Sequence, residues 1–208
     1  MSIRERKSRE RAHLKQKILS AALQVFAEQG YARVSMRKIA ALIDYSPTTI
    51  YRFFQNKEDL LRAIAAETYR DLAARFEKIK ADGGDRPLDL LKSLVKEYII
   101  FCVERPEMFR MFSDLVSFEM ENGIMYERLG GTRFKVFQSW FHGIRLAIES
   151  GDLELKDERR IFLYLWDAVQ GYLDHRIRQT RVPRKPVTYD SAEYLKLVFR
   201  GIEANKTK

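Results

Sequence analysis

Apolar side chains recur along this chain at the three- and four-residue spacing of amphipathic helices. From about His13 to Gln29 this spacing predicts one long helix that ends at Gly30. No segment alternates between apolar and polar residues as a half-buried strand does. The pattern therefore predicts an all-α protein of about nine helices. The other expected helices cover approximately residues 36–43, 47–54, 57–80, 88–104, 106–121, 132–150, 157–178 and 191–202.

Residues 35–61 hold two short predicted helices that are joined by a tight turn. Ser35 offers a hydroxyl N-cap for the first of them. Asp44 falls where the chain must turn, and Asp tolerates the left-handed conformation better than most residues. Ser46 and Pro47 then open the second helix, because proline is favoured at a first helical position, where no N–H is needed. This arrangement is a helix-turn-helix, which presents the N-terminal half of its second helix to DNA.

The second helix of this motif has two different faces. Ile50 and Phe54 lie four residues apart and are expected to point into the core. The residues left near the exposed half are polar, basic or aromatic: Thr48, Thr49, Tyr51, Arg52 and Phe53.

Residues 26–61 resemble the DNA-binding domain of the tetracycline-repressor-like (TetR) family of bacterial regulators. The resemblance depends on spacing, turn and flanking helices together. The matching residues are Phe26, Gly30, Tyr31, Ser35, Arg37, Ile39, Ala40, Ser46, Pro47, Thr49, Ile50, Tyr51, Phe54, Lys57, Glu58 and Leu60. The chain departs from the family in the turn, where Asp44 and Tyr45 replace the usual glycine and small aliphatic residue.

The resemblance implies two domains. An N-terminal three-helix DNA-binding domain with a basic arm would cover residues 1–56, and a helical effector-binding and dimerisation domain would cover residues 57–208. It assigns Thr49, Tyr51 and Lys57 to DNA phosphates. Beyond residue 77 or so, the chain shares only the family's helical layout.

The positions that read bases in relatives are occupied here by Arg37, Thr48, Arg52 and Phe53. Arg37 has the fork that pairs with guanine O6 and N7, and Pro47 or Thr48 can pack on a thymine methyl group. Ser46 completes the expected DNA-binding surface at the start of the helix. For Phe53 core packing is an equal alternative, and for Tyr51 the alternative is a buried ring that supports the turn.

The charge of the chain is concentrated near this motif. The net formal charge is +9. Residues 1–60 contain twelve Lys and Arg against six Asp and Glu, a net charge of +6, which leaves +3 for residues 61–208. Phosphate binding needs such a basic footprint, although charge alone also fits a solvated surface without a partner.

The first eleven residues form a basic arm that includes Arg4, Arg6, Lys7, Arg9 and Arg11. One interpretation is a disordered, solvated tail. The other is an arm that orders along DNA or in its minor groove.

Aromatic and sulfur-containing residues gather in the middle of the chain. Seven of the thirteen Phe lie between residues 101 and 141, and four of the six Met lie between residues 108 and 125. Such side chains suit an apolar effector pocket between helices, and plain core packing is the alternative. The candidate ligand-binding residues are Phe101, Phe109, Met111, Phe112, Phe118, Phe137, Trp140, Phe141 and Trp166.

The last two predicted helices each carry an apolar stripe. Residues 166–171 lie where the TetR family has its dimer helix. Periodicity alone does not separate a fold core from an interface, but helix-turn-helix proteins read two half-sites as dimers. We therefore expect a homodimer through the last two helices, bound to a palindromic operator in double-stranded DNA.

Other classes of protein are disfavoured. None of the three histidines has metal-ligand spacing to another His or to Cys, and no phosphate loop or nucleophile elbow occurs. We therefore expect no enzyme, no metal and no cofactor.

The longest apolar run, residues 98–103, is too short to span a membrane. A charged N-terminus and a single cysteine, Cys102, favour the cytoplasm.

The sequence thus favours a sequence-specific transcriptional regulator, a repressor released from its operator by a small apolar or amphipathic effector. The alternative is a helical small-molecule-binding protein whose DNA-binding head has lost sequence specificity. That protein would bind DNA with a steep salt dependence and no preference among sequences.

Overall fold

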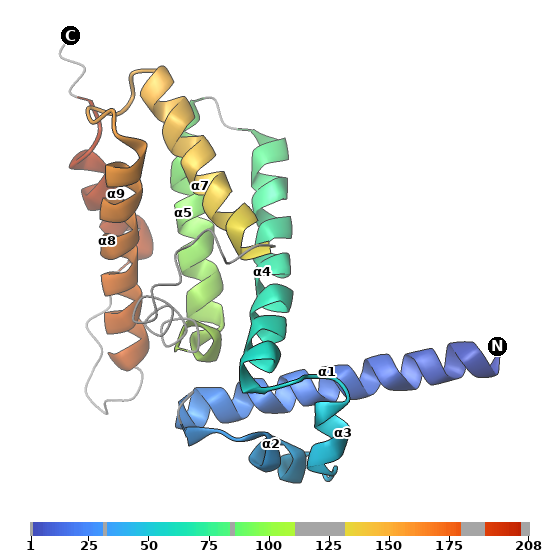
Figure 1. Ribbon diagram of the computed structural model, residues 1–208. Coiled ribbons are helices and arrows are strands. Elements are labelled where there is room, and N and C mark those ends of the chain that lie inside the picture. Colours follow the sequence, from blue (N-terminus) through green and yellow to red (C-terminus); the bar gives the residue numbers. More distant parts are fainter. Residues whose placement is uncertain (1, 31–32, 84–85, 111–131, 180–189, 205–208) are drawn as a thin grey trace. The chain divides into compact units, whose positions relative to one another are not determined.

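The computed structural model describes residues 2–30, 33–83, 86–110, 132–179 and 190–204, and in this part of the chain it is helical without strands. An isolated antiparallel bridge joins Leu153 to Glu203. Contacts divide the chain, which Figure 1 colours from its N-terminus to its C-terminus, into two units. Unit 1 comprises residues 1–68 and 107–128, and unit 2 comprises residues 69–106 and 129–208. This division by contacts falls within α4 (Lys57–Asp82) and differs from the functional boundary expected at residues 56 and 57.

Helix α1 (Ile3–Gln29) is longer than the sequence pattern suggested. Its start is fixed by a capping box, in which Ser2 Oγ accepts from the Glu5 N–H and Glu5 accepts from the Ser2 N–H. Gly30, with φ of 75°, ends it. The interpretation of a disordered tail was therefore wrong, because the basic residues from Arg4 to Arg11 form the first turns of a helix, whereas contact of this arm with DNA stays a prediction.

The helix-turn-helix is present with the predicted caps. Helix α2 (Met36–Leu42) begins where Ser35 Oγ accepts from the Lys38 N–H, and α3 (Pro47–Tyr51) begins where Ser46 Oγ accepts from the Thr49 N–H. Asp44 occupies the left-handed region with φ of 59°, as predicted for the turn.

The core of unit 1 lies between these helices and the start of α4. Its apolar side chains come from all four elements, and in Figure 1 α2 and α3 lie beside α1, whose first turns extend beyond them. Asn56 and Asp59 fix the start of α4, since Asn56 Oδ1 accepts from the Asp59 N–H at 2.7 Å and Asp59 accepts from the Gln55 N–H. The buried residues are Ile18, Ala22, Val25, Phe26, Ile39, Ala40, Ile43, Ile50, Phe54, Leu60, Leu61 and Ile64.

Unit 2 is a bundle built around α5 (Pro87–Glu104). This helix contacts α7 (Thr132–Glu149), α8 (Glu158–Gln179) and α9 (Ser191–Arg200). Gly143 permits the close approach of α7 to α5, since a Cβ atom there would lie 3.3 Å from the Leu91 side chain. The expected helix over residues 106–121 is seen only at residues 106–110, and its remainder lies outside the described residues.

Candidate DNA-binding surface and aromatic cluster

Helix α3 separates buried from exposed residues as its spacing predicted. Ile50 is 0% exposed and Phe54 is 3% exposed. On the opposite side Thr48 and Arg52 are exposed, and the Tyr51 side chain is 52% exposed. The alternative of a buried Tyr51 is therefore wrong, and its hydroxyl is available to a partner outside the chain.

Two hydroxyl groups lie together at the start of α3. Ser46 Oγ and Thr49 Oγ1 are 2.9 Å apart, so one of them donates to the other. Pro47 and Thr49 are half-buried beside the exposed Ser46. The pair can give only one hydroxyl hydrogen to an outside acceptor such as a phosphate oxygen.

Two cationic side chains, on Arg37 and Lys57, belong to the elements that precede and follow α3. Arg37 is exposed on the first turn of α2. Lys57 is half-buried as the first residue of α4, and burial lowers the pKa of its ammonium group. Since the capped start of α4 fixes the Lys57 backbone, this charge is held in place rather than carried on a loose surface segment.

Phe53 has features of both roles considered for it, core packing and exposure on the DNA-binding surface. It is half-buried, and its ring centroid is 6.5 Å from that of Phe54. The guanidinium carbon of Arg11 lies 5.6 Å from the Phe53 ring centroid, which is within the range of a cation–π contact. Phe53 therefore helps to hold a basic residue of α1 beside α3.

Two α1 residues belong to this surface: Arg11, which the sequence placed in the basic arm, and Lys17, which was not predicted. Lys17 donates from Nζ to the Ile43 carbonyl at 3.2 Å, and its ammonium lies 5.3 Å from the Tyr45 ring centroid. Lys17 thus ties α1 to the turn between α2 and α3. The available signal was the placement of these cations on the exposed face of an amphipathic helix, but no local pattern could specify their partners.

A groove of about 610 Å³ runs along this part of unit 1. It is lined by four cationic side chains, on Lys7, Arg11, Lys17 and Arg52, and by one carboxylate, on Glu10. Thr49 and Phe53 also line it. The groove therefore combines residues of α1 and α3 in a basic surface that suits phosphate oxygens.

We expect Lys17→Met to weaken DNA binding by several-fold, because the Ile43 carbonyl would lose its donor and the turn that positions α3 would loosen. Lys15→Met is the matched control, since Lys15 also lies near an aromatic ring, 6.0 Å from the centroid of Phe54, and the substitution removes the same charge. Titration of duplex DNA at one salt concentration measures both variants. Equal weakening would assign the effect to charge alone and contradict the role of the hydrogen bond.

A cluster of aromatic rings fills the interior of unit 2. It brings together four of the predicted ligand-binding residues and two that were not predicted, Tyr98 and Phe162. The predicted members are Phe137, Trp140, Phe141 and Trp166. Neighbouring ring centroids are 4.6 Å to 6.2 Å apart, in stacked, tilted and edge-on pairs.

Two polar groups are enclosed by this cluster. Trp140 Nε1 is buried without a hydrogen-bond partner among the described residues. Tyr98 Oη accepts from Gln170 Nε2 at 3.0 Å, and burial raises the Tyr98 pKa well above its usual range. The neighbouring Cys102 thiol has a pKa raised to about 12 by burial, so it is protonated at neutral pH.

The other predicted ligand-binding residues do not join this cluster. Phe101 is buried in unit 2, where the guanidinium groups of Arg75 and Arg105 lie 5.4 Å and 4.4 Å from its ring centroid. Phe109 is buried within unit 1. Three further candidates lie outside the described residues: Met111, Phe112 and Phe118.

Comparison with known proteins agrees with this geometry. Residues 18–64 match the sequence model of the bacterial regulatory proteins of the tetR family. The HTH-type transcriptional regulator RutR of Escherichia coli (strain K12) is 27% identical over 171 residues, which cover 81% of this chain and 78% of RutR. The DNA-binding transcriptional repressor TetR of Mycobacteroides abscessus is 50% identical over 46 residues, 22% of this chain and 24% of that protein.

A solved structure extends the likeness over most of the chain. The bacterial regulatory protein in the tetR family from Rhodococcus RHA1 has a TM-score of 0.65 and 25% sequence identity, and the match covers 89% of this chain and 95% of that one. Fold, capped helix-turn-helix and relatives together define a DNA-binding transcriptional regulator rather than an enzyme. Residues 18–64 thus match the DNA-binding region of the TetR family, and the chain as a whole is similar to regulators of that family.

No helix within the described part of the chain is long and apolar enough to cross a lipid bilayer.

Proposed function

We propose that this protein is a sequence-specific repressor that binds a palindromic operator as a homodimer and leaves it when a small apolar or amphipathic effector binds. The observation that carries the proposal is the exposed face of α3, where Thr48, Tyr51 and the C-cap residue Arg52 are exposed while the opposite face is buried. Repression requires only occupancy of a promoter, and the Mycobacteroides abscessus relative is itself named a repressor.

The residues divide into those that position the protein and those that read sequence. We assign phosphate contacts to Thr49, Tyr51 and Lys57, and base contacts to Arg37, Thr48, Arg52 and Phe53, with Ser46 and Pro47 at the start of α3. In this proposal residues 1–56 form the DNA-binding domain, and residues 57–208 bind the effector and form the dimer. The expected compartment is the cytoplasm, where the operator lies.

The two classes of contact have different expected effects on affinity. Lys57→Ala should weaken binding to all DNA sequences about equally and reduce the salt slope by about one. Arg37→Ala should instead relax the preference at one base pair in each half-site, at a cost of about 1–3 kcal/mol on the preferred sequence. Titrations of matched and mismatched duplexes at several salt concentrations measure both. A change in base preference in Lys57→Ala would show that the roles are assigned wrongly.

The effector site of the proposal lies among the predicted apolar residues of the C-terminal domain. The aromatic cluster of unit 2 supports it, because the buried Trp140 Nε1 is a donor that an effector oxygen can satisfy. Phe137, Phe141 and Trp166 would supply the apolar walls. The ligand-binding roles of Phe101, Phe109, Met111, Phe112 and Phe118 stay predictions from the sequence.

Thermodynamic linkage between effector binding and operator binding sets a quantitative condition on release from the operator. If the effector weakens operator binding by some factor, saturating operator must weaken effector binding by the same factor. Measuring both affinities at equilibrium checks this equality, and unequal factors would contradict the two-state mechanism.

The primary test is a selection of bound sequences from random duplex DNA at near-physiological salt, with the Arg37→Ala, Tyr51→Ala double variant as control. A two-fold symmetric motif that is enriched by the natural chain and lost in the variant is the expected result. Enrichment without symmetry would contradict the dimeric operator. Binding without any sequence preference would instead support the helical small-molecule-binding protein whose head has lost specificity.

A further inference from the structure

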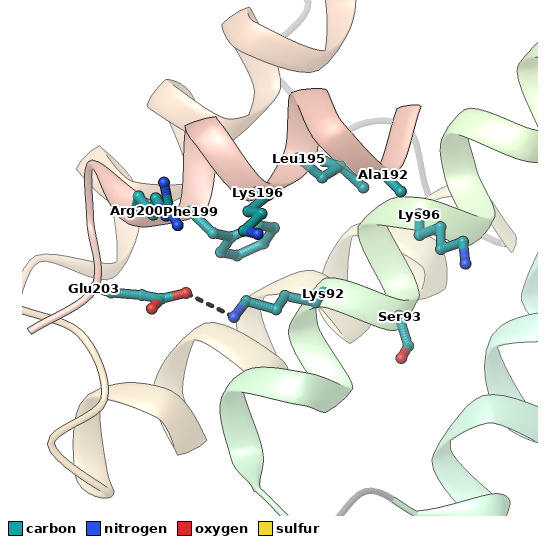
Figure 2. A pocket seen from close by; sticks show the side chains of 9 residues that line it. All are labelled: Lys92, Ser93, Lys96, Ala192, Leu195, Lys196, Phe199, Arg200 and Glu203. Carbon is teal, nitrogen blue, oxygen red and sulfur yellow. Dashed lines mark ion pairs between the residues drawn. The ribbon is translucent and has the colours of Figure 1, made fainter. Parts of the chain in front are cut away.

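A second groove lies on the surface of unit 2, between α5 and α9, and is separate from the aromatic cluster. Figure 2 shows the residues that line it from both helices. Its volume is about 400 Å³, within the range of sites that hold small molecules. Leu195 and Phe199 are buried residues that line it and give it apolar surface, while Lys92, Lys96, Lys196 and Arg200 also line it.

The charge of this groove is unbalanced. Its lining carries four cationic side chains against one carboxylate, that of Glu203, a net charge of +3. This equals the net charge of residues 61–208 as a whole, which have 26 Lys and Arg against 23 Asp and Glu. An ordinary solvated face intersperses both signs, whereas four of the five charged residues that line this groove are cationic.

The two helices also repeat like charges at adjacent turns. Lys92 and Lys96 are four residues apart on α5, and Lys196 and Arg200 are four residues apart on α9. Like charges at this spacing destabilise a helix. The groove therefore brings together two unfavourable pairs, which a bound anion would relieve.

Only one end of the groove has an internal counter-charge. Lys92 Nζ lies 2.6 Å from Glu203 Oε1 and 5.6 Å from the centroid of the Phe199 ring. Within the described part of the chain, Lys96, Lys196 and Arg200 have no ion-pair partner. These three cations are available to an external anion, and Ser93 adds a hydroxyl beside them.

We propose that the groove between α5 and α9 binds a small amphiphilic anion, a carboxylate or phosphate head on an apolar body. The head would contact cations of the groove, in which Lys196 lies between Lys96 and Arg200 in Figure 2, and the body would lie over Leu195 and Phe199. The apolar surface distinguishes this site from one for a bare inorganic ion, because burial of a hydrocarbon body adds to the binding free energy. The site goes beyond the proposed effector cluster and does not depend on DNA binding.

The test is isothermal titration of the full-length protein, without DNA, with octanoate and octyl phosphate below their micelle concentrations. We expect one equivalent to bind with a dissociation constant below about 1 mM. Octylammonium and 1-octanol have the same apolar body and should bind at least about tenfold more weakly. Tighter binding of octyl phosphate than of octanoate would define a phosphate head, and the reverse a carboxylate head; both support the site.

The Lys96→Glu, Lys196→Glu double variant locates the binding, since both residues are exposed and the changes should leave the fold intact. Lys78→Glu, Lys135→Glu is the matched control, because it makes the same change of net charge at exposed positions outside the groove. Thermal unfolding confirms that both variants are folded. We expect affinity for the anions to fall roughly tenfold or more in the groove variant and less than about twofold in the control. Equal losses in both variants, unchanged binding in the groove variant, or equal binding of octylammonium would overturn the proposal.

Discussion

Phe54→Ala is expected to lower the stability of the DNA-binding part of the chain by about 3–5 kcal/mol. The Phe54 ring is 3% exposed and lies in the core of unit 1 just after α3. Removal of the ring leaves a cavity directly after α3. The backbone there is tied to the helix, since the Phe54 N–H donates to the Ile50 carbonyl at 3.0 Å. Chemical denaturation measures the loss, and hydrogen exchange shows whether the amides of α2 and α3 lose protection first.

Phe53→Ala is the matched control for this prediction. It removes the same side chain from the adjacent position, but the Phe53 ring is only half-buried and lies at the edge of the core. Its expected loss is less than half that of Phe54→Ala, because less apolar area leaves water on folding. It should nevertheless weaken DNA binding, since Arg11 would lose the ring that holds it. Equal destabilisation by the two substitutions would contradict the packing described for α3.

Gly171→Arg is expected to convert the proposed dimer to a monomer and to lower operator affinity by about 100-fold or more, because a monomer engages a single half-site. Leu163 and Tyr164 are each 48% exposed on α8, an unusual exposure for large apolar side chains, and Gly171 is exposed further along the same helix. A Cβ atom at Gly171 would meet nothing within 4 Å in the protomer. Arginine should therefore fit the folded chain and even favour the helix by up to ~1 kcal/mol.

The proposed interface is what makes this substitution damaging. In a two-fold symmetric contact each copy would bring the introduced guanidinium to the shared surface, where two like charges lose water without a partner. Ala74→Arg is the control, because it adds the same charge at an exposed position of α4. Sedimentation velocity gives the oligomeric state and titration of the selected operator gives the affinity. A dimer that persists in Gly171→Arg would exclude this face of α8 from the interface.

Local chemistry explains which features could be predicted from the sequence. The caps at Ser35 and Ser46 and the left-handed Asp44 depend on neighbouring backbone groups, and all three are present as expected. The start of α1 was missed because a run of cations suggests an unfolded tail. The Ser2–Glu5 capping box and the ion pair of Arg6 with Glu10, with 3.6 Å between Nε and Oε1, favour a helix there instead.

In the candidate sites, too, features that depend on local sequence could be predicted, and features that depend on tertiary contacts could not. The exposed face of α3 follows from the spacing of Ile50 and Phe54, so its residues could be selected from the sequence. The contact of Lys17 with the turn is tertiary and has no local signature. The membership of the aromatic cluster was predicted only in part, since Phe162 belongs to it without having been predicted and Phe109 packs in unit 1.

The helical start of α1 has a thermodynamic consequence for the recognition of DNA. A basic arm that orders only on contact with DNA loses backbone entropy at that moment, about 1–2 kcal/mol per residue. Here the segment from Arg4 to Arg11 is already helical, so this entropy is lost when the chain folds. Its cations can meet phosphates as a preorganised array, and the heat capacity change of binding should lack the contribution of coupled folding.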